Sequence, residues 1–147
     1  MFDINQLETM DIVFASEAHE RFFREKVREL PNSRKDNKEV AMIYTLGICD
    51  MTRAAFTQIV AQRTEQINPM ALFAGWQTSA LMKVTRLAIN LYTGFSQTVN
   101  RDDSKEGYNF GEASTEYTVE EIFDCPYARY FIESVRLRYA IVLSEHK

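Results

Sequence analysis

The stretch from Trp76 to Phe95 constrains the fold more than any other, because it carries a strong helical pattern of apolar residues. At about 100° per residue, one broad arc collects Ala80, Leu81, Val84, Leu87, Ala88, Leu91, Tyr92 and Phe95. The polar residues share a narrow stripe formed by Ser79, Lys83, Arg86, Asn90 and Thr93. An arc wider than the roughly 100° of a surface helix has to be covered by several neighbours. We therefore expect a buried central helix at about 78–94, with Gly94 at its end.

Helix signals recur on both sides of this stretch. Capping residues, or a proline suited to a first turn, predict further helix starts at Ser16, Asp36, Asp50 or Thr52, Thr118 and Pro126. In the last helix, the expected buried face comprises Tyr130, Phe131, Val135, Tyr139 and Val142. Residues 1–15 show no clean period, which leaves both a short helix and a docked arm open.

No second domain, internal repeat or strand-like alternation interrupts this pattern. A chain of 147 residues can bury roughly two thirds of its unfolded surface around one core. We predict an all-α protein, a single compact helical bundle of five to seven helices that forms one domain over residues 1–147. Residues 96–117 are polar and contain Gly107 and Gly111, so they predict a long loop, which in a compact domain tends to be mobile or functional.

Charge and cysteine usage exclude several classes of protein. A net charge of −4 argues against a general nucleic-acid coat, although a local basic patch stays open. Cys49 and Cys125 form no CxxC pair, which favours free thiols in a reducing cytoplasm. There is no signal peptide and no run of eighteen apolar residues, so we expect a cytoplasmic protein without a membrane segment. The 12% of aromatic residues leaves surface to spare for a homo-oligomer interface.

The turn at the start of the central helix is the most suggestive binding cluster. Unpaired N–H groups of a first helical turn favour anions, and a neighbouring tryptophan offers a stacking surface. If arginines converge there, the site would hold a nucleotide or a phosphorylated metabolite. The candidate ligand-binding residues are Trp76, Gln77, Thr78, Ser79, Arg86, Asn90, Arg136 and Arg138. The alternative is structural: Thr78 or Ser79 only caps the helix, and the arginines pair with carboxylates.

Catalytic chemistry has weaker support. His19 falls on an inner helical face, where it is either a proton carrier or a satisfied core residue. Cys125 precedes Pro126 at a predicted helix start, where a thiolate is favoured, but it has no obvious partner. The sequence lacks HExxH, Walker A, GxGxxG and GxSxG patterns. We therefore name no catalytic residue, metal ligand or cofactor.

Several strings combine polar and aromatic residues in an order that amphipathicity alone does not dictate. They are Ala74-Gly75-Trp76-Gln77-Thr78-Ser79, Thr85-Arg86-Leu87-Ala88-Ile89-Asn90-Leu91-Tyr92, Phe123-Asp124-Cys125 and Arg136-Leu137-Arg138-Tyr139. In these strings, over roughly Glu17 to Tyr139, the chain resembles a domain-of-unknown-function family of small proteins from Gram-positive bacteria and their phages or mobile elements. The resemblance implies a bacterial or phage setting, and it brings no activity or catalytic residue with it.

Three functions follow, in order of support. The first is a non-enzymatic binding protein that acts through protein–protein interaction, alone or as a homodimer. The second is a binder of a small anionic ligand at the start of the central helix. The third is an enzyme that uses His19 or Cys125 with a carboxylate.

Overall fold

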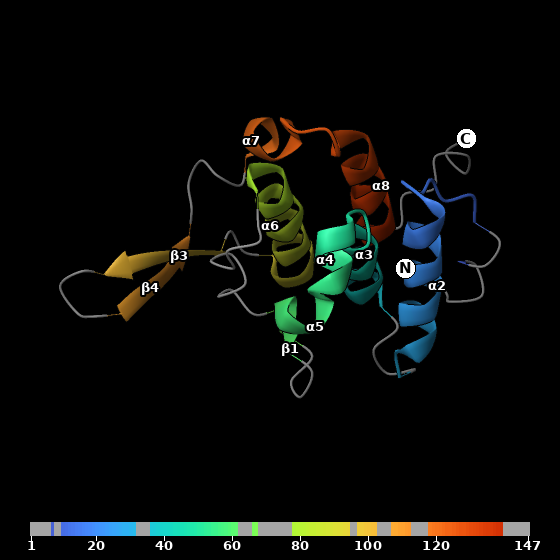
Figure 1. Cartoon of the computed structure of the whole chain (residues 1–147), viewed down its shortest axis with the longest axis horizontal. Coiled ribbons are helices and arrows are strands. Elements are labelled where there is room, and N and C mark those ends of the chain that lie inside the picture. Colours follow the sequence, from blue (N-terminus) through green and yellow to red (C-terminus); the bar gives the residue numbers. More distant parts are fainter. Residues whose placement is uncertain are drawn as a thin grey trace.

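Seven helices and two short antiparallel hairpins make up the described part of the chain, as the computed structural model shows (Figure 1). The described residues are 7, 10–31, 36–61, 66–67, 78–94, 97–102, 107–112 and 118–139. The helices are α2 (Glu17–Glu29), α3 (Asn37–Leu46), α4 (Asp50–Ala54), α5 (Phe56–Ile59), α6 (Ser79–Thr93), α7 (Val119–Phe123) and α8 (Ala128–Tyr139). The strands are β1 (Val60–Ala61), β2 (Gln66–Ile67), β3 (Gln97–Asp102) and β4 (Gly107–Glu112).

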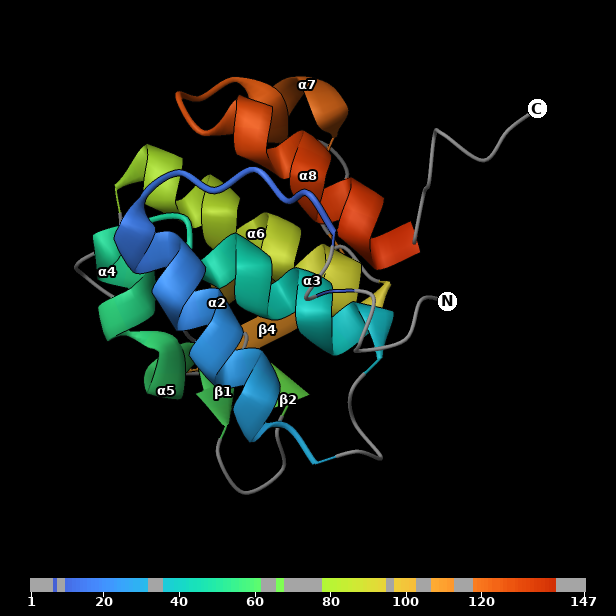
Figure 2. The same ribbon diagram turned by 90° about the vertical axis from the view of Figure 1, so that its right-hand side faces the viewer.

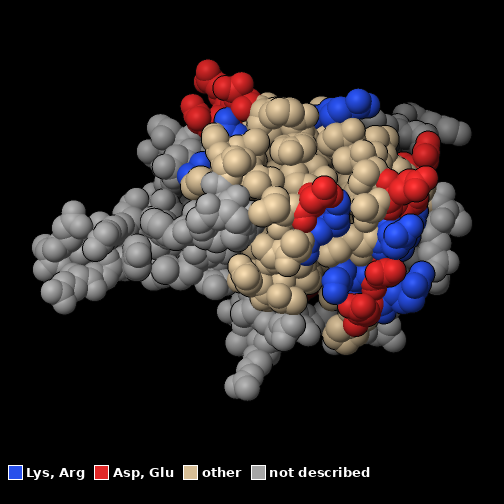
Figure 3. All heavy atoms as spheres, in the orientation of Figure 1, with Lys and Arg blue, Asp and Glu red and all other residues tan. Residues whose placement is uncertain are grey.

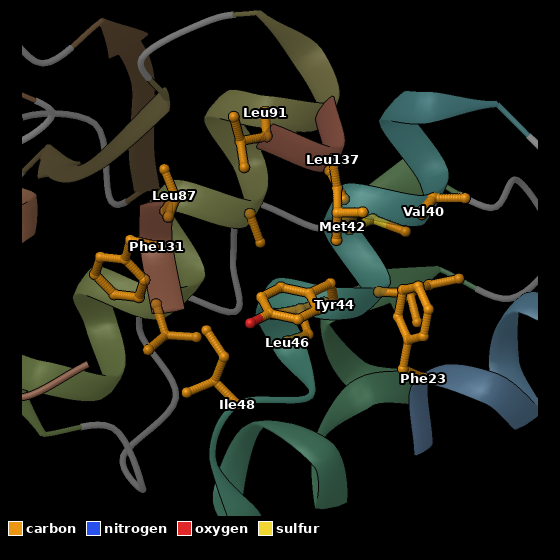
Figure 4. Close-up of a cluster of buried hydrophobic side chains, with 14 of the residues drawn as sticks. Phe23, Val40, Met42, Tyr44, Leu46, Ile48, Leu87, Leu91, Phe131 and Leu137 are labelled. Atoms are coloured by element: carbon orange, nitrogen blue, oxygen red, sulfur yellow. The ribbon is translucent and has the colours of Figure 1, made fainter. Parts of the chain in front are cut away.

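Two adjacent helices, α3 and α6, form the centre of the bundle (Figure 2). Nine of the ten residues of α3 are buried, and α3 packs against α6, α8 and α2. On α6, no residue from Ala80 to Thr93 is exposed. Figure 4 shows the result, a core to which α2, α3, α6 and α8 all contribute side chains. The predicted helical bundle with a buried helix at about 78–94 is confirmed, and α3 shares the central position.

Local sequence signals explain where most of these helices begin and end. Four predicted caps accept a hydrogen bond from the backbone N–H three residues on, namely Ser16, Asp36, Thr78 and Thr118. Such a bond satisfies a donor that the first helical turn leaves unpaired. At the other end of α6, Gly94 adopts a φ of 78°. This left-handed conformation is unfavourable for residues other than glycine.

The predicted loop at 96–117 is wrong for its described part, which forms the β3–β4 hairpin. The strands pair over six positions, with Val99 opposite Phe110 and Gln97 opposite Glu112. Tyr108 and Phe110 alternate with Asn109, a period of two rich in residues that favour strands. This alternation is short and is surrounded by glycines and polar residues, so the sequence pattern did not indicate a strand. Figure 1 shows the hairpin extending away from the helices.

The orientation of α8 also differs from the prediction. It begins at Ala128 rather than at Pro126, and its buried residues are Phe131, Glu133, Ser134 and Leu137. Tyr139, expected in the core, is 61% exposed. The reason lies in polar contacts: the hydroxyls of Ser134 and Thr45 are hydrogen-bonded at 2.8 Å, which fixes a partly polar face of α8 against α3.

Residues 11–15, which precede α2, form an arm docked against α3 and α8. The backbone N–H of Val13 donates to the Glu133 carboxylate at 2.8 Å, and the Tyr44 hydroxyl donates to the Val13 carbonyl. Burial raises the pKa of Tyr44, so this phenol keeps its proton. Phe14 fills the space beneath, with its ring centroid 5.1 Å from that of His19. Of the two alternatives for this segment, the docked arm is the one observed for residues 11–15.

Helix length and polarity also bear on the membrane question. Within the described ranges, none of the helices combines the length and the apolar character that crossing a bilayer requires.

Candidate functional site

The start of α6 is built as a capped helix end. Thr78 accepts a hydrogen bond from the Leu81 N–H at 3.3 Å, and Ser79 is exposed. Trp76 and Gln77, the other two residues of the predicted turn, lie outside the described residues. Farther along α6, Arg86 and Asn90 are half-buried. Seven residues separate Arg86 from Ser79, which corresponds to about 10 Å along the axis.

The two C-terminal arginines do not converge on that turn. Arg138 donates from Nε to the Leu91 carbonyl at 2.7 Å, which places it at the opposite end of α6, about 20 Å along the axis from Thr78. Arg136 pairs with Glu133 and also donates to the Asp11 carbonyl at 3.0 Å. The predicted convergence is therefore wrong for these two residues, because the last turn of α8 packs beside the last turns of α6.

His19 is a satisfied core residue. It is fully buried; its Nδ1 accepts from the Ala15 N–H at 3.0 Å, and its Nε2 donates to the Tyr44 carbonyl at 2.8 Å. Burial, the largest cause, lowers its pKa to about 4, with Arg53 contributing in the same direction and the bond to Tyr44 opposing it. The imidazole is therefore neutral at physiological pH, and both ring nitrogens are occupied by backbone groups.

The cysteines are free thiols with little access to solvent. Cys49 is buried, and burial raises its pKa, which keeps the thiol protonated. Cys125 is half-buried, and its Sγ lies 3.6 Å from the Ile122 carbonyl, to which it donates. Among the residues with described side chains, no group of three or more His, Cys, Asp or Glu could hold a metal ion.

The outward side of α8 carries an apolar surface that the sequence analysis did not identify. We call it the α8 stripe and define it as Ala128, Ile132, Val135 and Tyr139, which lie within about 60° on the helix. Ile132 is 65% exposed and Tyr139 61% exposed, whereas Ala128 and Val135 are half-buried and Val135 also packs against the core. Large apolar side chains this exposed and this regularly spaced are more informative than scattered ones.

Basic residues flank the α8 stripe. Arg129 is exposed and places its guanidinium 5.3 Å from the ring centroid of Tyr130. Arg136 and Arg138 are half-buried, and each is held by the hydrogen bonds described above. Within α8, all of whose residues are described, Glu133 is the only carboxylate, and it is buried between the Val13 N–H and Arg136. Because Glu133 neutralises Arg136, the positive charge beside the stripe comes from Arg129 on one edge and Arg138 on the other.

A hollow of about 510 Å³ lies at the last turn of α8. It is lined by the end of α8 and the start of α3, through Asp36, Asn37, Lys38, Arg138 and Tyr139. The Asn37 amide donates to the Leu137 carbonyl at 3.1 Å, which joins the two helices at its wall. Because Tyr139 belongs to both features, the hollow and the α8 stripe form one continuous surface.

A second concavity, of about 230 Å³, lies between the end of α2, α3 and α5. Its lining is largely apolar, with Met42, Ile43 and Phe56, and Lys26 sits over the Phe56 ring at 5.4 Å from the centroid. This cavity is less than half the size of the hollow beside α8.

Charged side chains are distributed unevenly over the molecule. Figure 3 shows charges of both signs gathered over α2 and a group of acidic side chains over α7, where Glu120 and Glu121 are exposed, while much of the face between them is uncharged. On α2, Arg24 pairs with Glu20 and Lys26 with Glu29, each at 3.5 Å. The outer face of α2 is therefore a solvated face on which charges of opposite sign are paired.

The signal for the α8 stripe was present in the sequence. Its members are separated by four, three and four residues, the spacing of a helix seam. Val135 and Tyr139 were assigned to the buried face instead, because Phe131 and Leu137 lie close to them in sequence and are equally apolar. Contacts with other elements, such as that between Ser134 and Thr45, show which of the two faces turns inward.

Comparison with known proteins places the chain in a family. A model described as a family of unknown function, DUF6075, matches residues 9–147, nearly the whole chain. No curated protein and no solved structure matches. The chain therefore belongs to the DUF6075 family, whose function is unknown.

Proposed function

We propose that this is a non-enzymatic binding protein that acts through protein–protein interaction, and that the α8 stripe is its contact surface. The observation that carries the proposal is the exposure of Ile132 and Tyr139 on a helix whose opposite face is packed into the core. Exposing two large apolar side chains on one stripe leaves roughly two thirds of their transfer free energy, on the order of 1–2 kcal/mol each, unrealised in the isolated chain. A partner that covers them recovers it.

The cellular setting is part of the same proposal. The resemblance to proteins of Gram-positive bacteria and their phages favours a bacterial or phage role, and the free cysteines favour the cytoplasm. A homo-oligomer is one arrangement in which such a stripe would be covered, and a different protein is the other. The anion-binding alternative is weakened by the distance of Arg138 from the start of α6.

Site-specific photo-crosslinking tests this function. A photoreactive phenylalanine analogue replaces Ile132 in one variant and Val119 in a matched control, because Val119 is even more exposed, at 73%, but lies on α7. Both variants are expressed in cells that carry the natural gene and irradiated there. We expect a discrete adduct of higher mass from position 132 and none from position 119.

Two results would contradict the proposal. If position 132 gives no adduct under conditions in which the analogue reacts with a free peptide, the stripe has no protein partner in those cells. If both positions give the same adducts, the contacts reflect general stickiness of exposed apolar groups rather than a binding surface.

A further inference from the structure

We infer that the partner seated on the α8 stripe is an acidic amphipathic helix. This inference rests on the proposed function and adds the chemistry of the partner. It depends on three features of the described residues: the spacing of the stripe, the sign of the charges beside it, and the hollow at its end.

The spacing of the stripe suits a helix. Members separated by four, three and four residues form one continuous seam along the twelve residues of α8, a length of roughly 18 Å. A helix of about three turns that carries apolar residues at the same spacing covers this seam with side chains interdigitated. An extended strand would need exposed backbone donors and acceptors, and those of α8 are used within the helix.

The charges beside the seam select the sign of the partner. Arg129 lies on one flank of the stripe and Arg138 on the other, and neither forms an ion pair with the sole carboxylate of α8, Glu133, which is paired with Arg136. Positions next to an apolar seam set partner choice through charge. Glutamate or aspartate at the matching positions of a partner helix would face these guanidinium groups at the rim.

A second copy of this chain is a poor fit for the same reason. Pairing α8 with its own copy brings the arginines that flank the stripe, Arg129 and Arg138, to a seam whose other side is also flanked by arginines, and like charges across a seam disfavour association. Nucleic acid is also a poor fit, because phosphates would have to lie over Ile132 and Tyr139, whose apolar surface gives them no partner.

The hollow beside Tyr139 provides room at one end of the seam. Its basic lining residues are Lys38, which is exposed, and Arg138, while Asp36 already caps α3. A bulky or acidic side chain from the last turn of the partner would enter this space. The surface from Ala128 to the start of α3 is therefore apolar along its middle and carries basic residues at its edges.

Two synthetic helices provide the probe. Both carry leucine at the seam positions and an outward lactam bridge that holds the helix; one has glutamate at every flanking position and the other has lysine. Fluorescence anisotropy measures the binding of each to the full chain. We expect the glutamate peptide to bind at least about tenfold more tightly at low salt, with the difference shrinking as salt is raised.

Variants of the full chain then locate the contact. Ile132→Asp should remove binding of the glutamate peptide, and Val119→Asp, the same change at an exposed site on α7, should leave binding unchanged. Arg129 is exposed, and Arg129→Glu should reduce the ratio of the affinities for the glutamate and lysine peptides by several-fold. Circular dichroism confirms that each variant retains its helices.

Three results would overturn the inference. The first is that the two peptides bind with equal affinity. The second is that a short DNA duplex binds more tightly than the glutamate peptide and still binds the Ile132→Asp variant. The third is that the chain sediments as a dimer and the Ile132→Asp variant as a monomer. The crosslinking experiment separates these failures from failure of the function itself. Adducts at position 132 without a preference for glutamate leave the binding role intact and reject the acidic helix, whereas absence of adducts rejects the binding role.

Discussion

In most proteins polar side chains lie at the surface and large apolar ones inside, but the interior around α3 and the outer side of α8 both depart from this pattern. Inside, His19, Thr45 and Ser134 are fully buried, and each is hydrogen-bonded. Outside, Ile132 and Tyr139 are mostly open to solvent. Buried polar groups that are satisfied fix one arrangement of helices, whereas exposed apolar groups on a packed helix contribute little to the fold. The first region therefore specifies the structure, and the second is available for binding.

The largest expected effect comes from a matched pair of isoleucines. Ile89 on α6 is fully buried and Ile132 on α8 is 65% exposed. Ile89→Ala should lower the free energy of unfolding by about 2–5 kcal/mol, because it removes packed methyl groups and leaves a cavity. Ile132→Ala should change it by no more than about 0.5 kcal/mol. Urea denaturation of both variants measures the difference. Similar losses would mean that the outer side of α8 is part of the core.

The next effect concerns pH and the buried imidazole. The pKa of His19 is about 4 in the fold, below the ordinary value of 6.5, so the unfolded chain takes up the proton first. The contribution of His19 to the free energy of unfolding is fully present above pH 6.5. It falls by about 3 kcal/mol in total as the pH is lowered from 6.5 toward 4. Urea denaturation at several pH values measures this loss.

The control for this pH effect is His19→Gln, whose amide can still donate to the Tyr44 carbonyl but does not titrate. Its baseline stability should be lower, and its dependence on pH over the same range should be weaker. If the two chains lose stability in parallel, the acid sensitivity belongs to other groups and the imidazole is not held neutral by burial.

The sequence predicted the parts of the fold whose signals are local and unambiguous. Ser16, Asp36, Thr78 and Thr118 cap helices as expected, because a cap depends only on a side chain and the N–H three residues on. The apolar arc of α6 is single and broad, so its burial could also be predicted. The contribution of α3 to the centre was less evident, because Asn37, Glu39 and Thr45 are polar and yet buried.

The candidate site could not be predicted in the same way. Two apolar stripes alternate along α8, and choosing between them requires knowledge of which one meets α3. The predicted convergence of Arg138 on the start of α6 is wrong for a related reason, since its place beside Leu91 follows from how α8 crosses α6. Periodicity within one helix carries no information about such contacts between helices, and for α8 that information lies in a serine and a threonine 89 positions apart.

The smallest expected effect tests that pair directly, through a double-mutant cycle on Thr45 and Ser134. The Thr45 hydroxyl also lies 2.7 Å from the Ala41 carbonyl and that of Ser134 lies 3.4 Å from the Tyr130 carbonyl, so each single variant leaves the remaining hydroxyl with a backbone partner. Thr45→Val and Ser134→Ala should each cost about 0.5–1.5 kcal/mol. The double variant should cost less than their sum by a similar amount, because the contact is lost only once.

Ile132→Ala, two positions before Ser134 and 65% exposed, serves as the control and should show no coupling to Thr45→Val. Additive losses at Thr45 and Ser134 would show that the hydroxyl pair does not orient α8, and the inward rotation of this helix would then come from its other contacts, above all the burial of Phe131 and Leu137.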